Sequence, residues 1–347
     1  MSSLKTTGTI PSAVYLLALS LFAMGSAEFL MGGILPMIAE DLRISLPTAG
    51  TLISAFAVGA LIGGPPFAIL ALRWPSRSAL FISQLAFIAA TVVSGLTVAM
   101  VLGGPAGTYI SEATGWRGGF WAVIAVTVIS AVAVLLALPK HTARDAKAPD
   151  LVTELRAMKR PALWVAYATT MFTTAAYMGT FGYIAALLME VSGLSAEWLP
   201  AVLILFGVGA FIGLTIGGRT ADAQPRGTLV AGIIGLIVSS AIIASFAASV
   251  WATVAMVFML GLAGFLLNPA VWGRVYVLAP DAPMLAGATN ASAFQAGLTL
   301  APLLAGIPIS LGYGLASVAW VGVIIAVASL LLAGLDARLS RTAAHSR

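Results

Sequence analysis

The sequence predicts an all-α polytopic membrane protein with about ten transmembrane helices, four in a first bundle and six in a second. Hydrophobic residues make up 60% of its 347 residues and charged residues only 8%, whereas about a quarter of the residues in soluble domains are charged. Apolar runs long enough to cross a bilayer, about 20 residues each, recur along the chain. The basic residues lie between these runs, so we expect a lipid bilayer and not nucleic acid as the surrounding partner.

Eight uninterrupted apolar stretches carry the ten predicted helices. Two of them, charge-free, are too long for one span at about 1.5 Å per residue, so each is divided, the first near Ala247–Trp251 and the second near Gly312–Gly314. In order, the stretches are Pro11–Met37, Thr48–Leu72, Ala79–Tyr109, Gly118–Leu138, Pro161–Leu188, Trp198–Gly217, Gly227–Gly273 and Ala282–Leu335.

The distribution of Lys and Arg predicts the orientation. With a cytoplasmic N-terminus, only Arg43 and Arg117 fall outside, and every other basic residue of the loops and tails falls inside. An even number of spans then places both termini in the cytoplasm. We therefore expect a multi-pass protein of the plasma (cytoplasmic) membrane.

The longest polar stretch divides the chain into residues 1–139, a linker at 140–160, and residues 161–347. Leu151, Leu155 and Met158 share one face of a short helix, which favours a helix on the membrane surface with Arg156, Lys159 and Arg160 toward anionic headgroups. A solvated linker is the equally weighted alternative. A basic cytoplasmic linker between two helical bundles is typical of secondary transporters.

Polar groups inside the spans are the candidate functional residues, because lipid makes them costly. Glu28 is the one acid well inside an apolar run, and burial favours its protonated form, so it is a candidate proton carrier. The alternative is a hydrogen bond to a neighbouring helix. Candidates for a cavity that binds an amphipathic, partly aromatic ligand are Tyr177, Phe181, Tyr183, Asn268, Asn290 and Gln295. For each of these, contact between helices is the competing and favoured role.

Catalytic chemistry has little support. Both histidines, His141 and His345, lie in the linker and the tail, and the chain has no cysteine, so neither a metal site nor a Ser-His arrangement fits inside the membrane. No nucleotide-binding Gly-Lys-Ser/Thr loop is present. We expect no enzyme, no cofactor and no ATP-driven pump.

The N-terminal part reads S-A-E-F-L-M-G-G-I-L-P, then P-T-A-G-T-L-I-S-A-F-A-V-G-A-L-I-G-G-P-P, and later S-G-L-T-V-A-M-V-L-G-G-P-A-G-T followed by G-W-R-G-G-F. These stretches resemble the first, second and fifth helices of the major facilitator superfamily in its drug:proton antiporter branch, and among its members the chloramphenicol exporters. The resemblance implies a fold of two six-helix halves and small-molecule and proton substrates.

Residue by residue, the resemblance assigns the antiporter motif to Gly95, Gly103, Gly104, Pro105 and Gly107. It implies that this motif bends the helix and restricts leak. The superfamily's cytoplasmic loop signature appears as a remnant at Arg73–Arg77 and more fully in the second half, and it implies gating charges at Arg73, Arg77, Asp222 and Arg226. The positive-inside rule alone is the competing explanation for these charges.

The chain departs from this family in having four spans, not six, in its first half. The stretch 78–111 is too short for two spans and a turn, so we infer that the end of the third helix, the whole fourth and the start of the fifth are absent, with a junction near Thr91–Gly95. The third and fifth helices of the family run in the same direction, so the later spans keep their orientation. The resemblance implies that the missing fourth helix carries an arginine that assists proton transfer.

Three hypotheses about function follow. The first is a proton-coupled exporter of a small amphipathic drug, such as chloramphenicol, by alternating access. The second is an internally deleted relative that inserts without transporting, or a membrane scaffold. The third is a transporter of a sugar, nucleoside or amino acid with the same fold. The sequence leaves the oligomeric state open.

Overall fold

The computed structural model describes residues 34–71, 116–137 and 151–345. Within these ranges every regular element is a helix, as the sequence predicts. Helices are expected in lipid because they satisfy their own backbone hydrogen bonds. Most of the first and third predicted apolar runs, at 11–37 and 79–109, lies outside the described residues.

In the first half the structure contains a helix at Ile34–Leu42, α2 at Leu46–Ala71 and α5 at Trp116–Ala137. The last two coincide with the second and fourth predicted spans. Ser45 caps the N-terminus of α2: its hydroxyl accepts a hydrogen bond from the backbone N–H of Thr48 at 3.3 Å.

Residues 161–345 contain six helices that are long and apolar enough to cross a membrane, the same number as the spans expected there. Their elements are α7 (Pro161–Gly182), α8 (Ile184–Ala186) and η1 (Leu187–Val191), then η2 (Ala196–Trp198) and α9 (Leu199–Ala223), then α10 (Pro225–Ser245), α11 (Val250–Leu266) with α12 (Asn268–Leu278), α13 (Pro283–Ser310) and α14 (Ser317–His345).

Proline and glycine mark the boundaries of these spans. Helices α7, α9, α10, α12 and α13 each have proline at their first or second position, where the missing N–H would be unsatisfied in any case. Gly312 and Gly314 adopt φ values of +86° and +76° in the turn before α14, a region that glycine enters without steric cost. Both expected divisions, near 247–251 and 312–314, are therefore confirmed.

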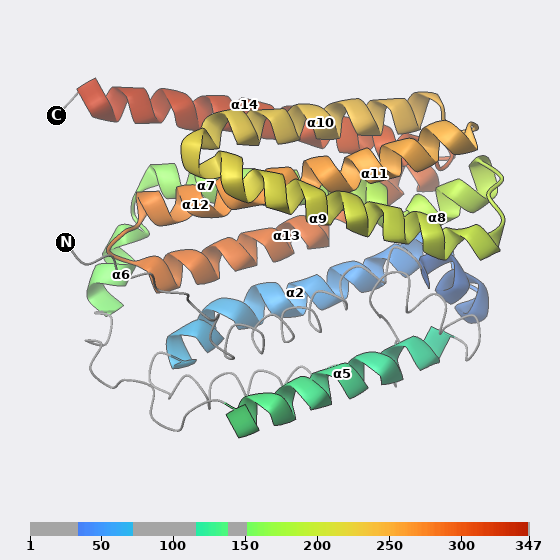
Figure 1. The fold of residues 1–347 in the computed structure, drawn as a ribbon, viewed down its shortest axis with the longest axis horizontal. Coiled ribbons are helices and arrows are strands. Elements are labelled where there is room, and N and C mark those ends of the chain that lie inside the picture. The colour runs from blue at the N-terminus through green and yellow to red at the C-terminus, as the bar shows by residue number, and fades with distance from the viewer. Residues whose placement is uncertain (1–33, 72–115, 138–150, 346–347) are drawn as a thin grey trace, which may run out of the picture.

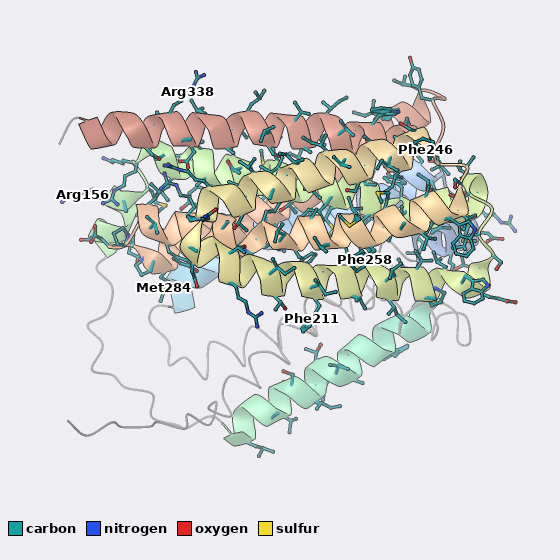
Figure 2. The ribbon with its side chains drawn as sticks, turned by 45° about the horizontal axis from the view of Figure 1, so that its top comes forward. Arg156, Phe211, Phe246, Phe258, Met284 and Arg338 are labelled. Atoms are coloured by element: carbon teal, nitrogen blue, oxygen red, sulfur yellow. The ribbon has the colours of Figure 1, made fainter. Side chains whose placement is uncertain are left out.

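The two ends of the second-half bundle carry different side chains. Four aromatic residues are exposed at one end, namely Trp198, Phe246, Trp251 and Tyr313. Trp198 precedes α9, Phe246 follows α10, Trp251 lies at the start of α11, and Tyr313 lies between α13 and α14. The arginines lie toward the opposite end, where Figure 2 shows Arg156 and Arg338, far from Phe246. Exposed aromatic rings at a helix end are typical of the membrane–water interface.

The linker contributes a short helix, α6, at Leu151–Ala157. Glu154 and Ala157 of this helix are buried, and Leu155 of the expected apolar face is half exposed. Part of the predicted linker therefore packs against the second-half bundle. Figure 1 shows α2 lying along α13, with α5 on the side of α2 that is away from the bundle.

Glycines allow α9 and α11 to pack with their backbones in contact. Gly209, Gly213 and Gly217 are spaced by four residues on one face of α9, and a Cβ atom added at any of them would collide with backbone atoms of α11. At Gly213 the obstructing group is the carbonyl of Leu262. Close approach through small residues is a main source of helix association in lipid, because burial of apolar side chains gains little there.

We expect Gly213→Ala to destabilise the protein by about 1–3 kcal/mol, because the added methyl group forces the two backbones apart. Gly218→Ala is the matched control, since nothing lies within 4 Å of a Cβ atom at that position. Helix propensity alone predicts that this control is neutral or stabilising by up to about 1 kcal/mol. Thermal unfolding of the two purified variants in detergent measures the difference, and equal midpoints would contradict the packing role of Gly213.

Candidate functional site

The surface where the first half meets the second is formed by α2 and α13. Ser54 Oγ of α2 donates a hydrogen bond to the backbone oxygen of Thr299 at 2.8 Å. Further along, Ser292 Oγ of α13 donates to the backbone oxygen of Leu61 at 3.4 Å. Residue numbers increase along α2 from 54 to 61, while those of its partners on α13 decrease from 299 to 292, so the two helices are antiparallel. Hydrogen bonds from small hydroxyl side chains join them directly.

Tyr183, a predicted cavity residue, lies where α2, α7 and α13 meet. It follows the end of α7, where the backbone departs from helical geometry, and its side chain is 1% exposed. The hydroxyl donates to the backbone oxygen of Pro302 on α13 at 3.1 Å. A Cβ atom on Gly50 of α2 would collide with this hydroxyl. Tyr183 therefore contacts both halves of the protein.

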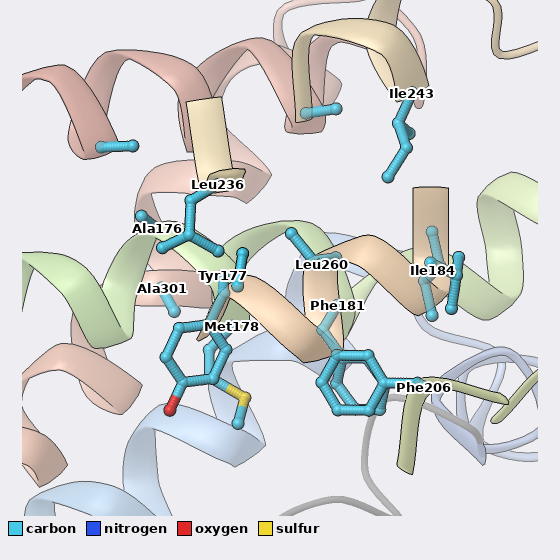
Figure 3. Packing of buried hydrophobic residues seen from close by; sticks show 14 of the residues in the cluster. Ala176, Tyr177, Met178, Phe181, Ile184, Phe206, Leu236, Ile243, Leu260 and Ala301 are labelled. Carbon is cyan, nitrogen blue, oxygen red and sulfur yellow. The ribbon is translucent and has the colours of Figure 1, made fainter. Parts of the chain in front are cut away.

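Tyr177 and Phe181 lie instead in the core of the second-half bundle. The ring of Phe181 is 4.1 Å from that of Phe206, and the ring of Tyr177 is 5.9 Å from that of Phe265. Gly264 leaves room for the Tyr177 ring, which a Cβ atom there would touch at 3.0 Å. Figure 3 shows Tyr177 and Phe181 surrounded by side chains of α9, α10 and α11. In this structure both residues have the helix-packing role that was the competing interpretation.

Asn290 is fully buried between α13 and α7. Its Oδ1 lies 2.7 Å from the hydroxyl of Thr170, and its Nδ2 has no hydrogen-bond partner among the described residues. Buried amide groups are nearly always satisfied. Asn290 thus offers one donor that the described part of the chain does not use.

The other predicted cavity residues are more dispersed. Gln295 is partly exposed on α13, and Asn268 is the first residue of α12. The helix is interrupted between α11 and α12 at Leu267, two residues before Pro269. The position of that proline predicts such an interruption. Asn290 and Gln295 therefore lie on α13 and Tyr183 contacts α13, whereas Asn268 lies on a separate span.

Two of the expected gating charges are described. Asp222 and Arg226 are exposed at the turn between α9 and α10, and neither makes an ion pair within the described ranges. The remaining predicted residues lie outside the described residues: Glu28, Arg73, Arg77, Gly95, Gly103, Gly104, Pro105 and Gly107. The described part of the chain also holds no group of acids and histidines able to bind a metal ion.

Sequence reasoning missed a largely buried ion pair that joins α12 and α14. Nε and Nη2 of Arg274 in α12 donate to Oδ2 and Oδ1 of Asp336 in α14, each at 2.9 Å. The same Nη2 also donates to Ser340 Oγ at 2.7 Å. Both side chains are largely buried, at 26% and 12% exposed. The available signal was an acid, Asp336, immediately after a long apolar run.

The sequence model of the Major Facilitator Superfamily matches residues 17–96 and 90–302. The chain belongs to this superfamily. A chloramphenicol resistance protein of Streptomyces lividans is 34% identical over 375 residues, covering 93% of this chain and 95% of the relative. The inner membrane transport protein YdhP of Escherichia coli (strain K12) is 31% identical, with the same coverage of each chain. The chain is therefore a membrane transporter by family, and its relatives are not enzymes.

Two solved structures share the fold. The nucleoside transporter NupG matches with a TM-score of 0.69 at 13% identity, covering 94% of this chain and 98% of that chain. The human organic anion transporter MFSD10 (TETRAN) matches with a TM-score of 0.68 at 14% identity, covering the same shares. At these identities the likeness supports the two-bundle fold alone.

The comparisons also bear on the predicted gap. Because 93% of 347 residues is about 323, about 50 of the 375 positions aligned with the chloramphenicol resistance protein have no residue in this chain. At about 20 residues per span this is the length of two helices. The family match is divided at 90–96, which is where the sequence places the junction.

We expect Asp336→Ala to destabilise the protein by about 1–3 kcal/mol, because it leaves the largely buried Arg274 guanidinium without its charge partner. Asp281→Ala is the control, since Asp281 pairs with Arg160 where both side chains are about half exposed and exposed pairs contribute about 0–1 kcal/mol. Thermal unfolding in detergent compares them. A double-mutant cycle with Arg274→Ala isolates the pair, and a coupling energy of zero would contradict this account.

Proposed function

We propose that the chain is a proton-coupled secondary transporter that exports a small amphipathic drug of the chloramphenicol kind by alternating access. The observation that carries this proposal is the similarity, over nearly the whole chain, to a chloramphenicol resistance protein. The resemblance of Gly95, Gly103, Gly104, Pro105 and Gly107 to the antiporter motif supports assignment to the drug:proton antiporter branch. The site of action is the plasma membrane, with both termini in the cytoplasm.

Alternating access needs a surface on which the two halves move relative to each other, and α2 with α13 supplies it in this proposal. The described hydrogen bonds across it are two from hydroxyl groups to carbonyl oxygens, and Gly50 lies close to Tyr183 and Pro302. In this proposal such contacts separate at less cost than interlocked large side chains. Tyr183, Asn290, Gln295 and Asn268 are the proposed substrate contacts. The free Nδ2 group of Asn290 is a donor for an oxygen of the substrate.

Proton influx through Glu28 is the proposed energy source. Each proton that moves inward across about 100 mV supplies about 2.3 kcal/mol. Arg73, Arg77, Asp222 and Arg226 act as cytoplasmic gating charges in this scheme.

A second candidate function is an internally deleted relative that folds in the membrane and does not transport. The gap of about 50 residues relative to the Streptomyces relative favours it, since the segment that we infer to be missing contains the family's fourth helix. Transport of a sugar, nucleoside or amino acid remains the third candidate. It is tested by whether such compounds, added in excess, compete with chloramphenicol for export.

We expect cells that express the chain to accumulate less chloramphenicol than empty cells, and Glu28→Gln to abolish the difference, because the amide cannot carry a proton. Glu197→Gln is the matched control, since Glu197 is an exposed acid in η2, in the segment between the α7 and α9 spans. Labelled chloramphenicol uptake at equal membrane protein levels gives the measurement.

Each outcome of this assay decides between the candidates. Equal accumulation in expressing, mutant and empty cells would refute active export and support the transport-inactive relative. Reduced accumulation that Glu28→Gln does not change would refute coupling through Glu28. Loss of export on adding excess sugars, nucleosides or amino acids would favour the third candidate.

We expect a cross-link between α2 and α13 to stop transport. The chain has no cysteine, so Ser54→Cys with Thr299→Cys introduces one defined pair at a place where the two residues touch. Treatment with a short bifunctional thiol reagent that contains a disulfide should arrest export, and reduction should restore it. The two single-cysteine variants are the controls. Undiminished export by the cross-linked protein would contradict movement at this surface.

A further inference from the structure

We propose that Glu154 of the linker is a positioning residue for α13, acting as the cap of that helix from outside it. Glu154 lies in α6, is 1% exposed, and its Oε2 accepts a hydrogen bond from the backbone N–H of Leu285 at 2.6 Å. The residue that precedes α13 is Ala282, which makes no side-chain cap. Pro283 at the first position has no N–H. The linker thus supplies the cap that the helix itself lacks.

The chemistry of this contact is favourable. The first N–H groups of a helix have no partner inside it, and a negative charge there is stabilised by the helix dipole. A buried carboxylate is costly without hydrogen bonds. Oε1 of Glu154 is buried with no hydrogen-bond partner among the described residues, whereas Oε2 has the N–H of Leu285. This explains why α6 turns its acid toward the bundle and leaves the neighbouring Leu155 half exposed.

Further contacts hold the same segment in place. Arg160 donates to the backbone oxygen of Leu278 at 2.5 Å and to Asp281 Oδ2 at 3.3 Å. Trp164 Nε1 donates to the backbone oxygen of Met158 at 2.9 Å. Arg160 therefore ties the linker segment 151–160 to the end of α12 and to the turn that follows it, and Glu154 ties it to the start of α13. Trp164 ties the same segment to α7.

The position of α13 gives this cap a role in the transport cycle. The same helix forms the contacts with α2 at Thr299 and Ser292, while the linker is the covalent connection between the two halves. Movement of the first half then acts on α13 in two places, along α2 and at the helix start through Glu154. This consequence rests on the proposed function, and the positioning role itself does not.

Spin labels on α13 test the positioning role directly. The cysteine-free chain permits a single label at Met284→Cys, beside the cap, where Figure 2 shows the side chain at the same end of the bundle as Arg156. Leu303→Cys, also partly exposed on α13, is the reference label. We expect Glu154→Ala to shift the spectrum of the label at 284 toward higher mobility and to leave the label at 303 unchanged. Glu197→Ala should change neither.

If Glu154→Ala unfolds the protein, the spin labels at 284 and 303 will both become more mobile. The Glu154→Asp variant then provides the test. Glu154→Asp retains the charge and shortens the side chain by one methylene group, so it should mobilise the label at 284 alone. Unchanged spectra at 284 in the folded Glu154 variants would overturn the proposal. Because the labels report on helix position without transport, loss of drug export in every variant would count against the proposed function and not against the cap.

Discussion

The structure depends most on α13, because this helix carries the contacts between the two halves. It packs against α2 of the first half, against α7 and α14 of its own bundle, and begins at the linker acid Glu154. Its surface suits this position, since Ser292, Gly297 and Gly306 keep it narrow. Gly297 lies directly against the backbone of α7 at Met171. A larger side chain there would push α7 away from α13, which carries the proposed substrate contacts Asn290 and Gln295.

The sequence predicts the second-half spans well because lipid imposes a simple rule. Charge-free stretches of known length must be helices, and proline and glycine mark where they begin and turn, as at Pro283 and Gly312. Pairings between distant polar residues follow no such rule. The Arg274–Asp336 pair joins residues 62 positions apart, and only the folded arrangement of the spans brings the two side chains together.

The candidate site shows the same division. A tyrosine near the end of a span was a reasonable candidate for a cavity, and its residue type does not distinguish Tyr177 from Tyr183. Their surroundings do: Gly264 of α11 receives the ring of Tyr177, whereas Gly50 of α2 receives the hydroxyl of Tyr183. The first contact lies inside one half and the second lies between the halves. The role of each tyrosine therefore depends on which glycine faces it, and a single sequence does not contain that information.

In the proposed function, the inferred gap in the first half affects coupling more than folding. If an even number of crossings is missing, as proposed, α5 and all later spans keep their direction. Helix α2 lies before the proposed junction, and its contacts with α13 are present. The second-half bundle is held by its own contacts, among them the backbone packing of α9 on α11 and the Arg274–Asp336 pair. What the gap removes is the helix that, by family resemblance, would assist Glu28. If the chain does not transport, we therefore expect a folded protein whose two halves still meet at α2 and α13, with the failure lying in proton transfer.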